Sequence, residues 1–336
     1  MKSINYININ TEYILDNLKI IKEKYPYPNY ILNVSNHAFA HGMYLIKTLD
    51  EQIDYLYVNH FEDLLMIRKY NDAIPVIYHG EIHEDNVYDL IMNNAILVIH
   101  DLNILKDIRN LNIKDTLSFI FYIDPTGYLG ISKKQDILEF LEWDNPHFNL
   151  LGVMAHLQEK DYEEFKHIIR PINNSKLMIL NSEEDKRKIQ GSNTILLDFS
   201  IYGINKIKRK LFQKNEVLLK QAFSLYSKVI SVKKDVNHKK NNFIAVIPFG
   251  YHHGMSDEIK FVYLNSKLYP VQKVFSETSY LLVDENVEKG MLVEITSLHN
   301  PLENYFSSYP LSYFQLFNSN IPIVYHDYIL EKMLIY

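Results

Sequence analysis

The run AILVIH (95–100) is the clearest indication of the fold in this sequence. Five consecutive apolar residues stand between polar neighbours, which is typical of a short strand buried on both faces of a sheet. Seven similar runs occur between residues 30 and 199, and most are followed by a more polar segment. They are YILNVS (30–35), DYLYV (54–58), IPVIY (74–78), LSFIFYI (117–123), LLGVMAH (150–156), LMIL (177–180) and TILLDF (194–199).

The segments between these runs have the apolar spacing of helices that cover a sheet. EDLLMIRKY (62–70) and KKQDILEFLEW (133–143) place apolar residues three or four positions apart. Eight buried strands that alternate with helices predict an α/β fold, a (β/α)8 barrel, more strongly than an open sheet.

The pattern changes after residue 203. A basic segment, INKIKRKLFQKNEVLLK (204–220), is interpreted as a solvated connection between domains. From Phe223 onward, short apolar runs alternate with turn residues, which indicates an all-β region. We therefore predict a barrel domain over 1–215 and a C-terminal β domain over 216–336.

Composition excludes several classes of protein. Lys+Arg 35 against Asp+Glu 41 gives a formal net charge of -6, so there is no electrostatic case for a nucleic-acid partner. With no cysteine, the chain has no disulfide, thiolate metal ligand or cysteine nucleophile. No stretch approaches the length of about 18 apolar residues that would span a membrane, and no signal peptide is evident. We expect a cytoplasmic protein without membrane contact.

Four motifs, in order along the chain, resemble those of one enzyme family. They are NVSNHAFAHGM (33–43), GVMAH (152–156), LDFSIYG (197–203) and IPFGYHHG (247–254). This ordered set resembles the alanine racemases, whose last motif reads Ile-Pro-Ile-Gly-Tyr-Ala-Asp-Gly. The resemblance implies a barrel followed by a β domain, the pyridoxal phosphate fold of type III, and isomerase activity on L- and D-alanine. It also implies a head-to-tail dimer whose sites take residues from both subunits.

The family's catalytic lysine is missing from this sequence. In the family that lysine holds pyridoxal phosphate as an imine, and its position is Ser35 here. Because a hydroxyl cannot form an imine, the family mechanism cannot run as written. The nearest lysine, Lys47, is expected about three turns into the following helix, away from the barrel mouth. Tyr251 occupies the position of the family's second base, and a lysine and an arginine of the family fall at Tyr122 and Tyr128.

The other cofactor-binding positions are mostly altered as well. By resemblance, Phe39 replaces a tyrosine that reaches the phosphate, and Leu196 replaces an arginine that faces the pyridine nitrogen. Asp198 replaces a glycine beside the phosphate, where a carboxylate would repel a dianion. His156 and Ser182 keep the family's site histidine and phosphate serine. We therefore expect no cofactor, and pyridoxal phosphate is implied by the family resemblance only.

The sequence is interpreted as a pseudoenzyme that binds a small molecule or serves as a partner subunit. It would form a homodimer, or a heterodimer in which Tyr251 enters the site of a true racemase-family subunit. One alternative is an alanine racemase that supplies D-alanine for cell-wall synthesis. A second is a metal-dependent barrel enzyme, although no metal site is assigned. Its candidate ligands would follow the strand ends: His37, His60, His79, His100, Asp101, Asp124, His156 and Asp198.

Overall fold

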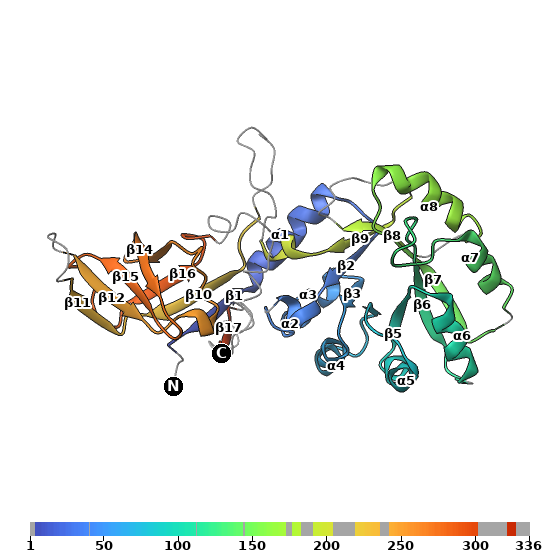
Figure 1. Cartoon of the computed structure of the whole chain (residues 1–336), viewed down its shortest axis with the longest axis horizontal. Coiled ribbons are helices and arrows are strands. Elements are labelled where there is room, and N and C mark those ends of the chain that lie inside the picture. Colours follow the sequence, from blue (N-terminus) through green and yellow to red (C-terminus); the bar gives the residue numbers. More distant parts are fainter. Residues whose placement is uncertain are drawn as a thin grey trace. The chain divides into compact units, whose positions relative to one another are not determined.

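A computed structural model describes most of the chain and divides it into two compact units. The barrel unit comprises Tyr25–Ala38 and Met43–Asp198, and the sheet unit comprises Met1–Lys24, Phe39–Gly42 and Phe199–Tyr336 (Figure 1). The described residues are 4–39, 41–111, 113–143, 145–172, 177–182, 191–203, 219–235, 242–301 and 321–326.

The barrel unit is a closed barrel of parallel strands that follow one another in chain order. Each of the eight apolar runs forms one of these strands, so the predicted (β/α)8 barrel is confirmed. The strands are β2 (Asn29–Asn33), β3 (Tyr55–Val58), β4 (Val76–Tyr78), β5 (Ala95–Ile99), β6 (Leu117–Tyr122), β7 (Phe148–Met154), β8 (Leu177–Ser182) and β9 (Thr194–Leu197). The pairing of β2 with β9 closes the barrel.

Helices with one apolar face surround the barrel strands in Figure 1. In α6, Leu102, Leu105 and Ile108 recur every three residues and are buried, while the Asp101 carboxylate caps the helix by accepting from the Asn103 amide. The helices of this unit include α3 (Leu45–Leu49), α4 (Phe61–Tyr70), α5 (Glu84–Met92), α6 (Leu102–Asn110), α7 (Lys134–Leu141) and α8 (Tyr162–Ile169).

The barrel interior is a packed core and not a channel. Its buried cluster combines branched aliphatic side chains with Tyr57, and Tyr122 and Met154 pack against it while partly exposed. The aliphatic members are Ile31, Ile77, Ile96, Val98, Ile120, Leu177, Ile179 and Leu196. This core fixes the strand ends on which the site described below is built.

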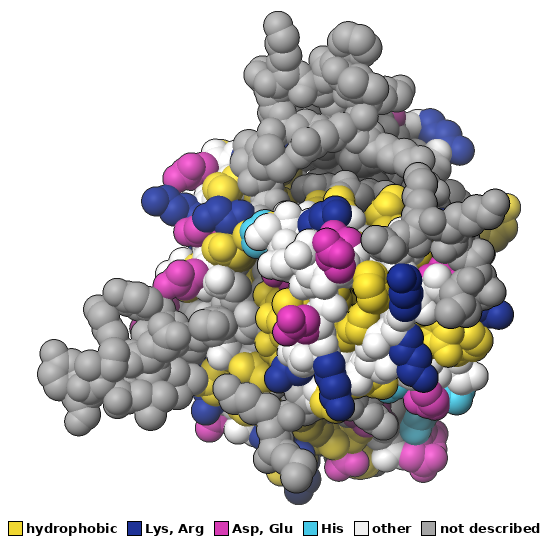
Figure 2. All heavy atoms as spheres, turned by 90° about the vertical axis from the view of Figure 1, so that its left-hand side faces the viewer, with side chains coloured by type: hydrophobic (Ala, Val, Ile, Leu, Met, Phe, Trp, Pro, Cys, Tyr) yellow, Lys and Arg dark blue, Asp and Glu magenta, His cyan; other side chains and the backbone are white. Residues whose placement is uncertain are grey.

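The described residues of the sheet unit form a mainly antiparallel sheet in the order β11-β12-β15-β14-β13-β16-β10-β1-β17. A C-terminal β region is therefore confirmed. The strands are β1 (Tyr6–Asn10), β10 (Phe223–Lys228), β11 (Ser231–Lys234), β12 (Phe243–Ile247), β13 (Phe261–Leu264), β14 (Lys267–Val274), β15 (Ser279–Val283), β16 (Leu292–Thr296) and β17 (Ile323–His326). The face in Figure 2 shows basic and acidic side chains interspersed over the described part of this unit.

The N-terminal segment belongs to the sheet unit by its pairing. β1 pairs with β10 and β17, and helix α1 (Thr11–Lys24) follows it directly. The buried amide of Asn17 in α1 donates to the carbonyls of Ile201 and Lys220 and accepts from the Lys220 amide, at 2.8 to 3.0 Å. The predicted boundary between residues 215 and 216 lies in 204–218, outside the described residues, and stays a prediction.

Candidate functional site

Polar and aromatic side chains gather at the carboxyl ends of the barrel strands, where barrel enzymes build their sites. Ser35 follows β2, His79 follows β4, His100 follows β5 and Asp198 follows β9, while Tyr122 ends β6. We call Tyr57, His79, His100, Tyr122 and Asp198 the mouth cluster.

Ser35, which the sequence resemblance predicts at the family's lysine position, is almost fully buried, with 1% of its surface exposed. Its hydroxyl oxygen accepts a hydrogen bond from the Asn59 amide at 3.1 Å. Its own amide donates to the Asn33 side chain at 3.0 Å. Ser35 therefore joins the ends of β2 and β3, and its hydroxyl offers no amine chemistry.

The chain after Ser35 makes a left-handed turn. Asn36, His37 and Ala38 have φ of 53°, 55° and 55°, which costs about 1 to 2 kcal/mol for each residue with a Cβ. The buried Asp63 carboxylate holds this turn by accepting from the Asn36 amide at 2.8 Å and the His37 amide at 3.0 Å. The cost of the left-handed backbone is thereby offset by two charge-assisted hydrogen bonds.

Lys47 does not lie where the sequence predicts it. It is the third residue of the five-residue helix α3, so its predicted place three turns into a helix is wrong. The turn at residues 36–38 delays the helix until Leu45. The Lys47 side chain is exposed and its ammonium lies over the rings of Tyr44 and Tyr70, at 5.7 and 5.6 Å from their centroids.

Four aromatic rings meet in the mouth cluster. The Tyr57 hydroxyl and His79 Nδ1 form a short hydrogen bond. The His79 ring stacks on the His100 ring with centroids 4.6 Å apart and 28° between planes. The Tyr122 ring lies 5.3 Å from His79 and 5.0 Å from His100. Because His79, His100 and Tyr122 are only partly buried, these rings present surface at the barrel mouth.

Three rings of the cluster, those of Tyr57, His79 and Tyr122, are electrically neutral at pH 7. Burial raises the pKa of Tyr57 and of Tyr122. Burial, with a smaller contribution from His100, lowers the pKa of His79 to about 4. Tyr57 therefore keeps its proton and His79 is uncharged at pH 7, and the His79 tautomer decides which of the two donates in their hydrogen bond.

Asp198 brings a negative charge to this neutral group. It is half-buried, and its Oδ1 accepts from the Asn33 amide nitrogen at 3.2 Å. Burial raises its pKa to about 6, against the opposing effect of the Asn33 hydrogen bond. After burial and Tyr122, the Asp198 charge makes a smaller contribution to the raised pKa of Tyr57. At pH 7 the carboxylate is ionised despite its burial.

Comparison with known proteins identifies the fold and family. The model of the alanine racemase N-terminal domain matches residues 9–196. The chain belongs to the alanine racemase family. It is 24% identical over 300 residues to an alanine racemase of Haemophilus influenzae, covering 78% of this chain and 80% of that protein. It is 23% identical over 297 residues to one of Mannheimia succiniciproducens, covering 79% and 81%.

Solved alanine racemases have the same fold. The structure from Oenococcus oeni superposes with a TM-score of 0.84 at 16% identity, covering 96% of this chain and 98% of that one. The structure from Bacillus anthracis with bound L-Ala-P superposes with a TM-score of 0.82 at 17% identity, covering 98% and 96%.

The residues present do not fit pyridoxal phosphate as the family holds it. Ser35 cannot form the imine, and the mouth presents the Asp198 carboxylate instead of a phosphate-binding backbone. A second negative charge about 5 Å from a carboxylate costs about 3 kcal/mol at an effective dielectric constant of about 20. Leu196 is buried in the barrel core, and the ring of Phe39 packs 4.2 Å from that of Phe199 without a hydroxyl to offer.

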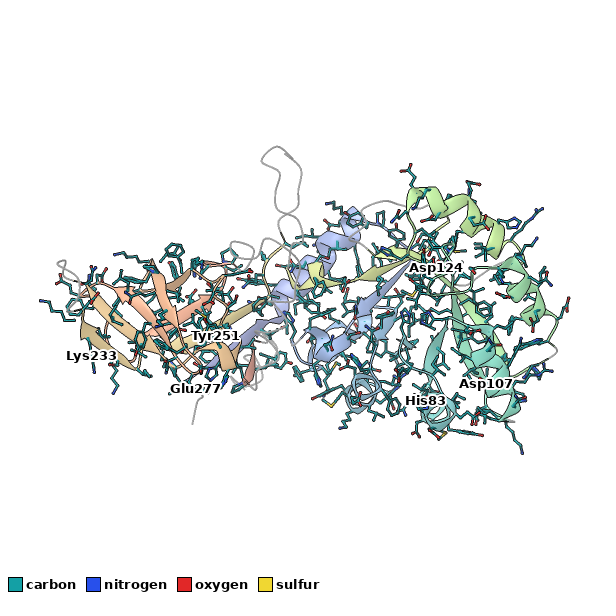
Figure 3. All side chains as sticks on the ribbon, viewed as in Figure 1. His83, Asp107, Asp124, Lys233, Tyr251 and Glu277 are labelled. Atoms are coloured by element: carbon teal, nitrogen blue, oxygen red, sulfur yellow. The ribbon has the colours of Figure 1, made fainter. Side chains whose placement is uncertain are left out.

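Tyr251, predicted at the family's second-base position, is 47% exposed in the short helix η5 (Tyr251–His253). Its hydroxyl donates to Asp257 Oδ1 at 2.7 Å, and this hydrogen bond raises its pKa. The adjacent His252 pairs with Glu277 at 2.5 Å, and Figure 3 shows Tyr251 and Glu277 in the same part of the sheet unit. Its raised pKa means that less of the Tyr251 side chain is present as the phenolate at neutral pH.

The remaining predicted residues have other places in the chain. His156 follows β7 and is exposed, and the side chain of Ser182 lies outside the described residues. Asp124, labelled in Figure 3, accepts four hydrogen bonds within its own loop. The other strand-end candidates serve as helix-start or loop residues: His37, His60 and Asp101. Within the described ranges, no three His, Asp or Glu side chains group as a metal site.

Sequence reasoning missed Asn33, Asn59 and Asp63 as parts of the site, and Tyr57 as a member of the cluster. Asn33 could have been found, because it is a polar residue at the end of an apolar run, and such residues lie at the barrel mouth. Asp63 carries no such signal, because its helix position is that of an ordinary first-turn acid.

Proposed function

We propose that this chain is an alanine racemase-family protein that does not carry out pyridoxal phosphate chemistry and acts by binding a small molecule at its barrel mouth. The observation that carries this proposal is the buried Ser35, whose hydroxyl is hydrogen-bonded to the Asn59 amide at the lysine position. Without an amine there is no covalent anchor and no base on that face of a substrate.

The mouth cluster favours the binding of a small molecule. Its three partly exposed rings lie within about 5 Å of one another, and the half-buried Asp198 carboxylate follows β9 at the same end of the barrel. Aromatic surface with a few polar atoms is typical of small-molecule sites. We infer a cytoplasmic protein, in keeping with the composition.

Service as a partner subunit is the second candidate function. It is favoured by the large exposed fraction of Tyr251, the residue that a family dimer places in its partner's site. The pairing would be with a second copy or with an intact racemase-family chain. Co-purification from the source cell tests this candidate, and recovery only as a monomer or homodimer would remove the mixed pair.

The main proposal is tested with the purified full chain and added pyridoxal phosphate. We expect no visible imine absorbance and no racemisation of L-alanine. The matched control is the Haemophilus influenzae alanine racemase under the same conditions. A saturable imine band, or turnover of L-alanine above the uncatalysed rate, would refute the proposal.

A further inference from the structure

We propose that a cavity between helices α6 and α7 binds small organic amines, with the Asp136 carboxylate as counter-ion and the Tyr128 ring at the opening. The cavity has a volume of about 500 Å³ and is lined by parts of α6 and α7 and by the loop that joins β6 to α7. Small-molecule sites commonly have volumes of about 300 to 1,000 Å³. The inference goes beyond the proposed function, because this cavity shares only His100 with the mouth cluster.

The loop between β6 and α7 is held in one conformation by its own hydrogen bonds. The Asp124 carboxylate, labelled in Figure 3, accepts from the Thr126 amide at 2.9 Å and from the Thr126 hydroxyl at 2.6 Å. It also accepts from the amides of Tyr128 and Leu129, at 3.0 and 2.8 Å. His100 Nδ1 donates to the Leu129 carbonyl at 3.1 Å, since a carbonyl can only accept. Because the loop is already ordered, a ligand that binds against it loses little free energy to ordering.

This ordered loop exposes two apolar side chains at the opening of the cavity. Tyr128 is 92% exposed and Leu129 is 61% exposed, and both line the cavity. A ligand that covers them removes apolar surface from water, which favours binding. The face of a tyrosine ring also attracts an ammonium group within about 6 Å of the ring centroid. An apolar ligand with an ammonium group would use both properties.

The ionisable side chains that line the cavity favour a positive ligand. They are Asp101, Asp136, Glu139, Lys106 and His100. The Lys106 ammonium pairs with Glu139 at 2.8 Å, and the Asp101 carboxylate caps α6. The half-buried Asp136 carboxylate has no hydrogen-bond or ion-pair partner among the residues that the structure describes. An ammonium beside Asp136 would therefore gain a charge-assisted hydrogen bond without displacing a group of the protein.

An organic amine fits this cavity better than a metal ion does. Calcium takes 6–8 oxygen ligands at about 2.3 to 2.6 Å, and magnesium requires near-octahedral coordination. In the part of the chain that the structure describes, no three His, Asp or Glu side chains group in such a way. An amine needs one carboxylate, and its apolar body can occupy the remaining volume beside Tyr128 and Leu129.

Titration of the intact chain with phenethylammonium chloride, followed by calorimetry and ligand-detected NMR, tests this proposal. Phenethyl alcohol is the neutral counterpart of this ion, and hydrocinnamate is an anion of similar size with the same ring. We expect saturable binding of phenethylammonium, about 10-fold weaker binding of the alcohol and none of hydrocinnamate. Asp136→Asn keeps the size of the side chain and should weaken phenethylammonium binding about 10-fold.

Two further variants locate the binding. Asp107→Asn is the matched control, because it removes an exposed acid of α6 that does not line the cavity, and its affinity should equal that of the wild type. Tyr128→Ala alters a side chain that is 92% exposed, so it should fold as the wild type does, and it should weaken binding about 3- to 10-fold.

Three results would overturn the proposal. They are no saturable binding of phenethylammonium, equal affinity for the ion and its alcohol, or equal affinity of the wild type, Asp136→Asn and Tyr128→Ala for the ion. None of these results bears on the proposed function, which is tested by imine formation and turnover of L-alanine.

Discussion

Replacement of Asp198 by asparagine should stabilise the folded protein at neutral pH. The carboxylate is an acid whose pKa in the folded state, about 6, lies above its usual value of 3.8 because of burial. Below pH 3.8 it is protonated in both states and has no effect. As the pH rises through 6, the folded state must hold a charge that the unfolded chain exposes to water, and stability is lost. Asparagine keeps an acceptor for the Asn33 amide and removes the charge.

The size of the effect follows from the two pKa values. Their difference corresponds to about 3 kcal/mol at pH 8, where the carboxylate is ionised in both states. Reorganisation around the new amide will reduce this gain, so we expect about 1 to 3 kcal/mol. At pH 4 the gain should shrink to a few tenths of a kcal/mol, since the folded-state carboxylate is then mostly protonated.

Urea unfolding of the wild type and of Asp198→Asn at pH 8 and pH 4, monitored by circular dichroism and tyrosine fluorescence, measures this difference. Asp107→Asn, which removes an exposed acid of α6 (Figure 3), serves as the control for a simple change in net charge. The reasoning is refuted if Asp198→Asn unfolds at lower urea than the wild type at pH 8. That result would show that a cation of the protein already compensates the carboxylate.

Four further predictions concern the same strand ends. Asp63→Ala should cost about 2 to 4 kcal/mol in urea unfolding, because it leaves two amides of the left-handed turn without their acceptor. His37→Gly should raise the free energy of unfolding by about 1 kcal/mol, since a φ of 55° suits glycine. The control Lys69→Gly, in α4, should lower it by a similar amount. A lower free energy of unfolding for both variants would contradict the strained turn. Between pH 6.5 and 4 the unfolded chain binds a proton at His79 and the folded state does not, so His79 lowers the free energy of unfolding by up to about 3 kcal/mol as the pH falls. His79→Gln should abolish this loss. Parallel profiles of stability against pH for the wild type and the variant would count against this. Ser35→Lys alone should yield no racemisation of L-alanine, because Asp198 still repels the cofactor phosphate, and measurable turnover would show that the other losses matter less than we infer.

The barrel was predictable because its strands are buried on both faces. Burial leaves runs such as LSFIFYI (117–123) that differ plainly from the helices between them. The place of the N-terminal strand was less evident, since it is assigned to the sheet by its pairings with β10 and β17, both more than 200 residues away. Local pattern contains no information on such a partner.

The site was predictable only in part. Residue type alone excludes an imine at Ser35, and strand order places His79 and His100 at the barrel mouth. The left-handed turn was not foreseen, because Asn36 to Ala38 contain no glycine and the turn depends on Asp63, which is distant in sequence. The stacking of the imidazole rings likewise depends on the stagger of neighbouring strands, which a linear sequence does not contain.

Borohydride reduction of the purified protein saturated with pyridoxal phosphate, followed by intact-mass measurement, tests the central claim most directly. Reduction fixes any imine as a stable pyridoxyl adduct on whichever lysine formed it. We predict the unmodified mass of the chain for the wild type, with complete labelling of the Haemophilus influenzae enzyme treated in parallel. A stoichiometric adduct on one lysine of this chain would contradict the claim that it has given up the family's chemistry.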